Sequence, residues 1–304
     1  MMPRKPPLPC LNCCDEYCRI DPKRPPCQGI DPLAIAEAAN NKLRSVTTED
    51  ISAVVVIYKP QVEKLNQCLE ALLPQVSEIV VVGDMDTPTP LVGALNDRKI
   101  RFLFMQATDT GYGRKATYGA RHSNGRYIWF CNDDLYPNQD VAAQLMKLLE
   151  PEDVGVATHL LRYPGIGGTR GLIQYAGVGR PPGHVGFGHI DLKKMESRYK
   201  APVEQEGCCG ASMIVKRKAF FQVDGFCEQY RLYSEDADFS MKIRKAGWKI
   251  MFTPLATGIH DEHQSAKLRP DIDAIRRESA ELFARKWRDY FRRNPDVNKL
   301  GTFK

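Results

Sequence analysis

The repeated alternation of apolar strands and helices constrains the fold of this chain more than any other feature. Short runs rich in β-branched and aromatic residues occur at 51–57, 78–82, 100–105, 127–131 and 154–157. Segments with apolar residues at helical spacing, or bounded by glycine, lie between them at 61–73, 111–125 and 138–149. Strands that are apolar throughout are buried on both faces. The pattern therefore predicts an α/β fold with a mostly parallel sheet between two layers of helices.

Polar residues follow three of these strands at the point where each strand ends. Right-handed crossovers bring the carboxyl ends of parallel strands to one edge of a sheet, and ligands bind at that edge. The sequence therefore predicts one crevice shared by the side chains of Tyr58, Lys59, Asp84, Asp86, Asn132, Asp133 and Asp134.

The segment Asn132-Asp133-Asp134 places two adjacent carboxylates directly after an aromatic strand. Alternate residues of an extended segment share a face, so Asn132 and Asp134 can present an amide oxygen and a carboxylate together. Mg²⁺ and Mn²⁺ take such oxygen ligands in combination with phosphate oxygens. The same residues can instead cap the helix at 138–149, and the motif alone does not separate these two interpretations.

Two further polar residues at strand ends each allow a functional and a structural interpretation. Asp84 can accept the imide N–H of a uracil or thymine ring, or it can be a turn residue before Thr87 and Pro88. His260 can complete the ligand shell of a metal ion, or it can have a purely structural role. Its place in the cluster His260-Asp261-Glu262-His263 favours the metal.

Glu235 and Asp236 begin a predicted helix, with Ser234 as the expected N-cap residue. The helix macrodipole stabilises negative charge at this end. A carboxylate here that faces a cleft can act as a general base toward a hydroxyl group. Helix capping alone is the simpler alternative.

The start of the chain is rich in proline and cysteine. It lacks the apolar segment of a secretory signal, so a reducing, cytoplasmic location is expected. In that compartment metal binding is favoured over disulfides, and the spacing suits structural Zn²⁺, although a second Cys-x-x-Cys pair is missing. The alternative is a loosely ordered tail with free thiols. The candidate zinc ligands are Cys10, Cys13, Cys14, Cys18 and Cys27.

Composition and periodicity divide the chain into three parts. We expect an appendage at 1–32, a catalytic domain at 33–265 and a basic amphipathic helix within 266–304 that docks on the domain. The domain would consist of a nucleotide-binding half, 33–160, and an acceptor half, 161–265. No apolar run is long enough to span a bilayer, and no feature indicates the oligomeric state. Candidate substrate contacts in the glycine-rich loops of the acceptor half are Arg170, Arg180, His184 and His189.

In order along the chain, these segments resemble an inverting glycosyltransferase of family 2 with the GT-A fold. Within that family the chain is most similar to the rhamnosyltransferase-like branch. The resemblance extends over about residues 51–265. It is carried by ISAVVVIYK, EIVVVGDMD, GYGRKATYGARHSNGRYIWFCNDD and GIHDEHQS, and most specifically by the segment 207–248, GCCGAS to RKAGW.

The resemblance implies a role for each matching residue. Asp84 would contact the nucleotide base, and the donor side would also include Tyr58, Asp86, Lys115 and Asp133. A divalent cation, Mn²⁺ or Mg²⁺, would be held by Asn132, Asp134 and His260. The general base would be Asp236, next to Glu235. The acceptor would contact Cys209, Gly210, Arg180 and His184.

The implied reaction moves a sugar from a UDP- or dTDP-sugar to a hydroxyl of a glycan-type acceptor in one displacement, with metal assistance. Two residues depart from the usual family pattern. Asn132 stands where aspartate is usual, and Thr117 stands where asparagine is frequent. These differences bear on metal affinity and donor choice.

Three alternatives to this function differ in acceptor or chemistry. The basic C-terminal helix and a zinc knuckle would suit transfer to a hydroxylated base of nucleic acid, but no nucleic-acid-binding signature is present. A non-catalytic nucleotide-sugar-binding module would explain Asn132, but Asp134, Asp236 and His260 are all retained. A nucleotidyltransferase would need a loop rich in glycine and basic residues after the first strand, where this chain has YKPQVEKLNQ.

Overall fold

The computed structural model describes residues 48–85, 97–165, 171–179, 185–261 and 269–294. Two short 3₁₀ turns, η1 and η2, are Thr48–Asp50 and Leu73–Gln75. The first half of the chain forms β1 Ile51–Val56, α3 Val62–Leu72, β2 Glu78–Asp84, β3 Ile100–Met105, α4 Tyr112–Arg121, β4 Tyr127–Asn132, β5 Leu135–Pro137, α5 Val141–Leu148 and β6 Val154–Arg162. The second half forms β7 Ile173–Tyr175, β8 Val178–Gly179, β9 Gly188–His189, β10 Val203–Gln205, β11 Ser212–Lys216, α6 Arg217–Gln222, α7 Glu235–Lys245, β12 Lys249–His260 and α9 Ile272–Arg293.

One central sheet has the strand order β10-β12-β6-β11-β4-β1-β2-β3, and β5 and β7 pair with β12 and β6. The block β3, β2, β1 and β4 is entirely parallel, as the apolar runs predict. β6 and β12 are also parallel to each other, whereas β11 lies antiparallel between β4 and β6. The predicted α/β fold is confirmed, with an antiparallel strand inserted in the sheet.

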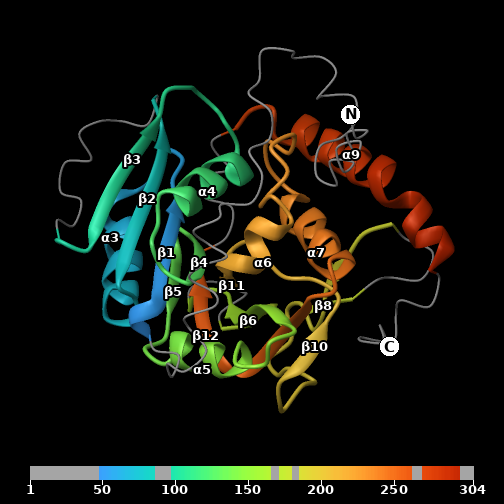
Figure 1. Cartoon of the computed structure of the whole chain (residues 1–304), viewed down its shortest axis with the longest axis horizontal. Helices are drawn as coiled ribbons and strands as arrows, with labels where there is room; N and C mark the ends of the chain where they lie inside the picture. Colours follow the sequence, from blue (N-terminus) through green and yellow to red (C-terminus); the bar gives the residue numbers. More distant parts are fainter. Residues whose placement is uncertain (1–47, 86–96, 166–170, 180–184, 262–268, 295–304) are drawn as a thin grey trace, which may run out of the picture.

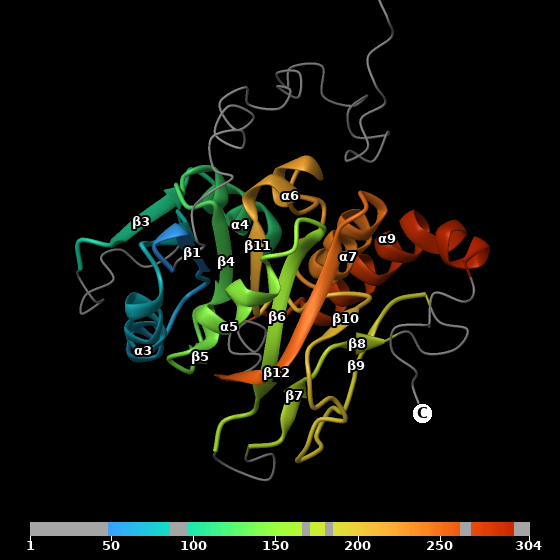
Figure 2. The ribbon, with the colours of Figure 1, turned by 60° about the horizontal axis from the view of Figure 1, so that its bottom comes forward.

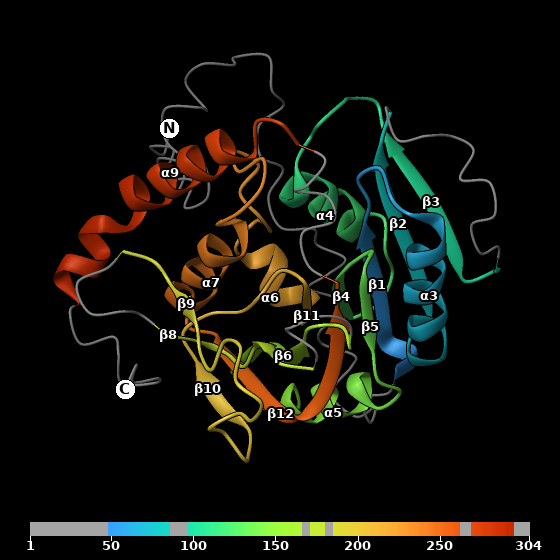
Figure 3. The same cartoon turned by 180° about the vertical axis from the view of Figure 1, so that it is seen from behind.

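Helices cover both faces of the sheet because successive side chains of a strand point to opposite faces. On β1, Ala53 and Val55 belong to one apolar cluster with the leucines of α3 and α5. Val54 and Val56 belong to a second cluster with α4, α6 and α7. Figure 1 shows α4, α6 and α7 in front of the sheet, and Figure 3 shows α3 from the other side.

The direction of β11 determines what lies beside the end of β4. Ser212 of β11 pairs with Cys131 of β4, and the Asn132 N–H donates to the Ala211 carbonyl at 3.1 Å. Because β11 is antiparallel, its first residues lie at the edge of the sheet where β4 ends. The segment 208–211 is thereby brought to the predicted crevice.

β12 is longer than its sequence suggests. The sequence predicts one strand at 248–252 and a separate strand that ends near His260. The structure has a single strand with an irregularity between Thr253 and Thr257. Figure 2 shows β12 beside β6 along its length. At its end, His260 pairs with Leu135 of β5, which places the histidine next to the residues that follow β4.

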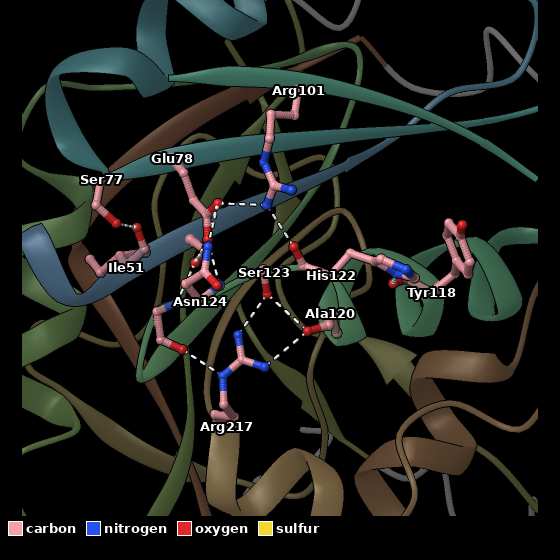
Figure 4. Close-up of polar contacts among 12 residues, drawn as sticks. Ile51, Ser77, Glu78, Arg101, Tyr118, Ala120, His122, Ser123, Asn124 and Arg217 are labelled. Carbon is pink, nitrogen blue, oxygen red and sulfur yellow. Dashed lines mark hydrogen bonds and ion pairs between the residues drawn. The ribbon is translucent and has the colours of Figure 1, made fainter. Parts of the chain in front are cut away.

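The opposite edge of the sheet, where β1 and β2 begin, is closed by two groups of hydrogen bonds (Figure 4). Glu78 accepts hydrogen bonds from Ser52, Arg101 and Asn124. The guanidinium group of Arg217 donates to the Gly125 and Ala120 carbonyls and to the Ser123 hydroxyl. These bonds fix the connection between α4 and β4, at the edge away from the crevice.

The C-terminal helix α9 docks on α7, as its apolar stripe predicts. Buried side chains of α9, including Phe283 and Trp287, share an apolar cluster with Met241 of α7. Asp238 of α7 is fully buried and accepts a hydrogen bond from Trp287 Nε1 at 2.8 Å. The ammonium group of Lys286 lies 2.8 Å from the same carboxylate. The helix therefore supports α7 within its first turn, which also contains Glu235 and Asp236.

One expectation about the start of the chain is not addressed by the structure. The cysteine-rich appendage at 1–32 lies outside the described residues, so the division into three parts stays a prediction. In the portions of the chain that are described, no helix combines the length and apolar character needed to cross a membrane.

Candidate active site

A buried ion pair lies at the donor side of the crevice. Lys115 Nζ of α4 is 3.0 Å from Asp84 Oδ2 at the end of β2, and the two side chains are 2 % and 1 % exposed. Lys115 also donates to the Ile57 carbonyl at 3.0 Å, and the Thr110 N–H donates to Asp84 at 3.3 Å. These contacts offset part of the free-energy cost of burying both charges, and they hold the ends of β1 and β2 against α4.

The ring of Tyr58, just beyond β1, is surrounded by cations. The guanidinium group of Arg269 lies 4.1 Å from the ring centroid, and the ammonium groups of Lys59 and Lys115 lie at 5.4 and 5.5 Å. Arg269 also forms an ion pair with Asp109. Tyr58, Asp84 and Lys115 thus lie together as predicted, whereas the sequence interpretation missed Arg269 because no local pattern connects it to Tyr58.

Asp109 holds two arginines from distant segments beside this group. Arg231 and Arg269 both form ion pairs with its carboxylate. Burial acts to raise the pKa of Asp109, but the hydrogen bonds and charges of the two guanidinium groups outweigh it and lower that pKa. The carboxylate is therefore ionised at neutral pH and anchors Arg269 over the Tyr58 ring.

The three predicted metal ligands meet at the end of β4. Asp134 Oδ1 lies 3.1 Å from His260 Nε2, and Asn132 Nδ2 lies 3.0 Å from the same nitrogen. The helix-capping alternative is wrong for Asp133 and Asp134. Helix α5 begins at Val141 after Asp140, and Asp134 contacts His260 instead.

The donor set fits a hard or borderline divalent cation. A carboxylate oxygen and an imidazole nitrogen at this spacing suit Mn²⁺, and Mg²⁺ accepts one or two carboxylates with phosphate oxygens and water. Within the described ranges, no group of three or more Cys, His, Asp and Glu side chains is arranged to hold a metal on its own. A cation at Asp134 and His260 would therefore take its other ligands from substrate and water.

Asp133 is the middle residue of the segment Asn132-Asp133-Asp134. Burial, followed by the neighbouring charge of Asp134, raises the pKa of Asp133 to about 7, against the opposing charges of Lys115 and His260. Its place on the donor side stays a prediction.

A cavity of about 310 Å³ lies at the start of α7. It is lined by Val178, Phe187, His189, Cys208 and residues 233–237. Asp236 Oδ2 accepts a hydrogen bond from the Gly210 N–H at 2.9 Å. The predicted base and one predicted acceptor residue are thus in direct contact, and half-buried Cys209 directly precedes Gly210 in the chain.

The backbone before α7 departs from the predicted cap. Ser234 has φ 64° and its side chain makes no capping hydrogen bond, and Tyr233 before it has φ 68°. An N-cap residue normally has extended backbone, so the left-handed conformation explains why the predicted Ser234 cap is wrong. Consecutive non-glycine residues in this region are strained, and such strain concentrates at functional sites.

Glu235 and Asp236 are adjacent but chemically different. Glu235 Oε2 is buried and has no hydrogen-bond partner among the described residues. Burial, and then the charge of Asp236, raises the pKa of Glu235 to about 8. Asp236 instead accepts hydrogen bonds from the Gly210 and Ala237 N–H groups. Because the raised pKa of Glu235 keeps its proton in place, Asp236 is the member of the pair suited to act as a base.

The raised pKa of Glu235 predicts a pH-dependent stability. The carboxyl ionises near pH 4.5 in the unfolded chain and near 8 in the folded chain. Between these values the unfolded state binds fewer protons, so the wild type loses stability as the pH rises. We expect the stability of E235Q relative to that of the wild type to be higher at about pH 8 than at about pH 5.

Urea unfolding at both pH values measures this difference. D153N, which changes an exposed carboxyl paired with Lys249, is the matched control and should follow the wild type. Identical pH responses of E235Q and the wild type would mean that Glu235 is ionised in the folded protein.

This chain is similar to known proteins in sequence and in fold. The family model for glycosyl transferase family 2 matches residues 52–221, more than half of the chain. The chain belongs to glycosyltransferase family 2. The matched range includes Asp84, Asn132 and Asp134 and ends before α7. The fold of this family 2 chain then places His260 against Asp134 and Asp236 against Gly210.

One similar relative is an N-acetylglucosaminyl-diphospho-decaprenol L-rhamnosyltransferase of Mycobacterium tuberculosis. It is 39 % identical over 61 residues, which cover 20 % of this chain and 20 % of the relative. The match thus spans a fifth of that protein's length, and it agrees with the predicted rhamnosyltransferase-like branch.

Two solved structures share the fold. GalNAc-T7 with UDP, GalNAc and Mn²⁺ has a TM-score of 0.62 and 16 % identity, over 83 % of this chain and 52 % of that chain. TarS of S. aureus with UDP-GlcNAc has a TM-score of 0.52 and 15 % identity, over 83 % of this chain and 74 % of that chain. The predicted GT-A fold of this family 2 chain is confirmed.

Several predicted site residues lie outside the described residues and stay predictions. They are Asp86 on the donor side, Arg170, Arg180 and His184 in the acceptor half, and the five candidate zinc ligands Cys10, Cys13, Cys14, Cys18 and Cys27.

Proposed function

We propose that this protein is a metal-assisted, inverting glycosyltransferase that moves a sugar from a UDP- or dTDP-sugar to a hydroxyl group of a glycan-type acceptor. The observation that carries the proposal is the meeting of three groups at one edge of the sheet. These are the Asp84–Lys115 pair, the Asp134–His260 pair, and Asp236 beside a cavity.

The donor side favours a uracil or thymine nucleotide. Asp84 would accept the ring N–H, because a carboxylate has enough lone pairs to accept this bond in addition to those from Lys115 and Thr110. The Tyr58 ring and the nearby cations suit a base and a diphosphate. The two similar structures were solved with UDP and with UDP-GlcNAc.

The metal site would hold Mn²⁺ or Mg²⁺ through Asp134 and His260, with Asn132 beside them. When bound, the cation supplies positive charge next to the departing diphosphate. Lys115 and Arg269 place N–H donors on the donor side, each beside a carboxylate that balances its charge, so the oxygens of the leaving group would meet donors already in place.

Asp236 would accept the proton of the acceptor hydroxyl. The acceptor oxygen then forms a bond to the anomeric carbon on the face opposite the nucleotide, while the bond from that carbon to the diphosphate oxygen breaks. The bonding electrons leave with the nucleotide diphosphate. One such displacement inverts the configuration of the sugar carbon.

The cavity favours a neutral, hydroxyl-bearing acceptor over nucleic acid. Its lining includes the carboxyl groups of Glu235 and Asp236, and none of the lining residues that the structure describes is lysine or arginine. Phosphate groups would be repelled there, whereas sugar hydroxyls can hydrogen-bond to His189 and Asp236. The nucleic-acid alternative therefore has less support than the glycan.

A thermal-shift series with UDP, dTDP, GDP and CDP, each with and without Mn²⁺, tests the donor site. Binding to the folded state adds about 2.7 kcal/mol of stability at a ligand concentration 100 times Kd. We expect UDP or dTDP to raise Tm in the presence of Mn²⁺, and D134N to lose the metal-dependent part. D153N is the control for an exposed carboxylate. No shift with any nucleotide in the presence of Mn²⁺ would contradict the proposed function.

A further inference from the structure

Gln174 of β7 contacts the candidate metal ligand His260 through both atoms of its amide. Its Oε1 accepts a hydrogen bond from His260 Nδ1 at 2.7 Å, and its Nε2 donates to the His260 carbonyl at 3.5 Å. A reversed amide would bring two carbonyl oxygens together, so the pair of bonds fixes the amide orientation. Gln174 is 3 % exposed, and water does not compete for these bonds.

This orientation determines which nitrogen of His260 carries the proton. An amide oxygen accepts hydrogen bonds and cannot donate, so Nδ1 must be the protonated nitrogen. In the neutral imidazole, Nε2 then carries the lone pair. This lone pair accepts a hydrogen bond from Asn132 Nδ2 at 3.0 Å, and Nε2 lies 3.1 Å from Asp134 Oδ1. A divalent cation bound by Nε2 and Asp134 would take the place of the Asn132 hydrogen bond.

The position of Gln174 is itself well determined. β7 pairs with β6 on either side of it, through Ile173 with Arg162 and Tyr175 with Leu161. The Gln174 carbonyl also accepts a hydrogen bond from Nδ1 of His189, at 2.9 Å. His189 lines the cavity beside Asp236. One residue thus orients a histidine at the metal site with its side chain and a histidine of the cavity with its main chain.

We propose that Gln174 is a positioning residue for the metal site, which holds His260 in the Nδ1–H tautomer and directs Nε2 to a divalent cation shared with Asp134. The inference rests on the proposed function, since it concerns the metal of the same site. A metal-bound histidine needs a partner for its second nitrogen, and loss of that partner weakens metal binding about 10–100-fold. The sequence interpretation missed Gln174 because its strand is short and no motif marks it.

The first test is Mn²⁺ binding in the presence of UDP, with free Mn²⁺ measured by electron paramagnetic resonance. We expect Q174L to raise the Kd for Mn²⁺ about 10–100-fold. The matched control is Q75L, which removes another buried amide with both atoms bonded, to the Ala71 carbonyl at 2.9 Å and the Ala142 N–H at 3.0 Å. Gln75 precedes β2, at the opposite edge of the sheet, so Q75L should lose stability without losing Mn²⁺ affinity.

The second test reads the tautomer directly and needs neither metal nor nucleotide. In ¹⁵N imidazole spectra, the His260 signals are those that disappear in H260N. We expect the Nδ1–H form in the wild type, and a shift toward the Nε2–H form in Q174L. In Q174E a carboxylate can accept the same hydrogen bond, so this variant should keep the Nδ1–H form and recover Mn²⁺ affinity.

Each outcome has a definite consequence. Unchanged Mn²⁺ affinity in Q174L, or an unchanged tautomer, would overturn the role of Gln174 and leave the proposed function standing. If the wild type bound no Mn²⁺ with UDP or with the other nucleotides, both the metal-assisted function and this inference would be overturned. Equal losses of Mn²⁺ affinity in Q174L and Q75L would show that general destabilisation is the cause.

Discussion

Replacing Asp236 by asparagine is expected to lower kcat for sugar transfer by about 10²–10⁴-fold, the usual contribution of a general base. Asparagine has nearly the same shape, and its side-chain oxygen can still accept the hydrogen bond that Gly210 donates to Asp236 at 2.9 Å. It cannot accept a proton from the acceptor hydroxyl. The loss should therefore appear in kcat, while Tm and nucleotide affinity stay close to those of the wild type.

The measurement is the release of the nucleoside diphosphate from sugar nucleotides that carry the base identified by the thermal-shift series, with a glycan acceptor or with water as the slow acceptor. D153N is the control, because it makes the same chemical change at an exposed carboxylate that pairs with Lys249. Transfer by D236N at the wild-type rate would assign the base to another residue. Loss of nucleotide affinity in D236N would mean that the carboxylate contributes to donor binding.

Replacing Lys115 by methionine is expected to lower the free energy of unfolding by about 3–5 kcal/mol, because the substitution leaves the Asp84 carboxylate buried without its counter-ion. Both side chains of this pair are almost completely buried. The Ile57 carbonyl also loses its 3.0 Å hydrogen bond from Lys115. Because these groups hold the ends of β1 and β2 at the donor side, nucleotide affinity should fall as well.

Urea unfolding of K115M, D84N and the double variant measures this coupling. The double variant leaves no buried charge, so it should be less destabilised than the sum of the two single variants. K249M removes a lysine from the exposed pair with Asp153 and should leave stability nearly unchanged. If K115M unfolded at the same urea concentration as the wild type, another group of the protein would have to compensate the charge of Asp84.

Most of the fold was accessible from the sequence because its strongest signals are local. The apolar runs at β1, β2 and β4 and the helical spacing in α3 need only a few neighbouring residues to be recognised. Parallel strands bring their ends together, so Tyr58, Asp84 and Asp134 could be predicted as one group without knowledge of the packing. Glu235 and Asp236 were noticed at the start of a predicted helix, and the family resemblance assigned the base to Asp236.

The remaining features depend on contacts between residues far apart in the sequence. The direction of β11, which places Gly210 against Asp236, and the continuity of β12, which brings His260 to Asp134, are decided by strand pairing. The left-handed backbone at Ser234 replaces the expected cap. Such choices leave no local pattern, because the competing arrangements share the same propensities and differ only in tertiary contacts.

The sequence by itself therefore determined the family, the layered α/β architecture and most of the residue types at the site. The tertiary structure alone decided their chemical states. Burial raises the pKa of Glu235 beside Asp236, Lys115 balances the charge of Asp84, and Gln174 orients His260. The physical reason is that protonation and orientation depend on the polarity and hydrogen-bond partners around a group, and these exist only after distant segments have packed together.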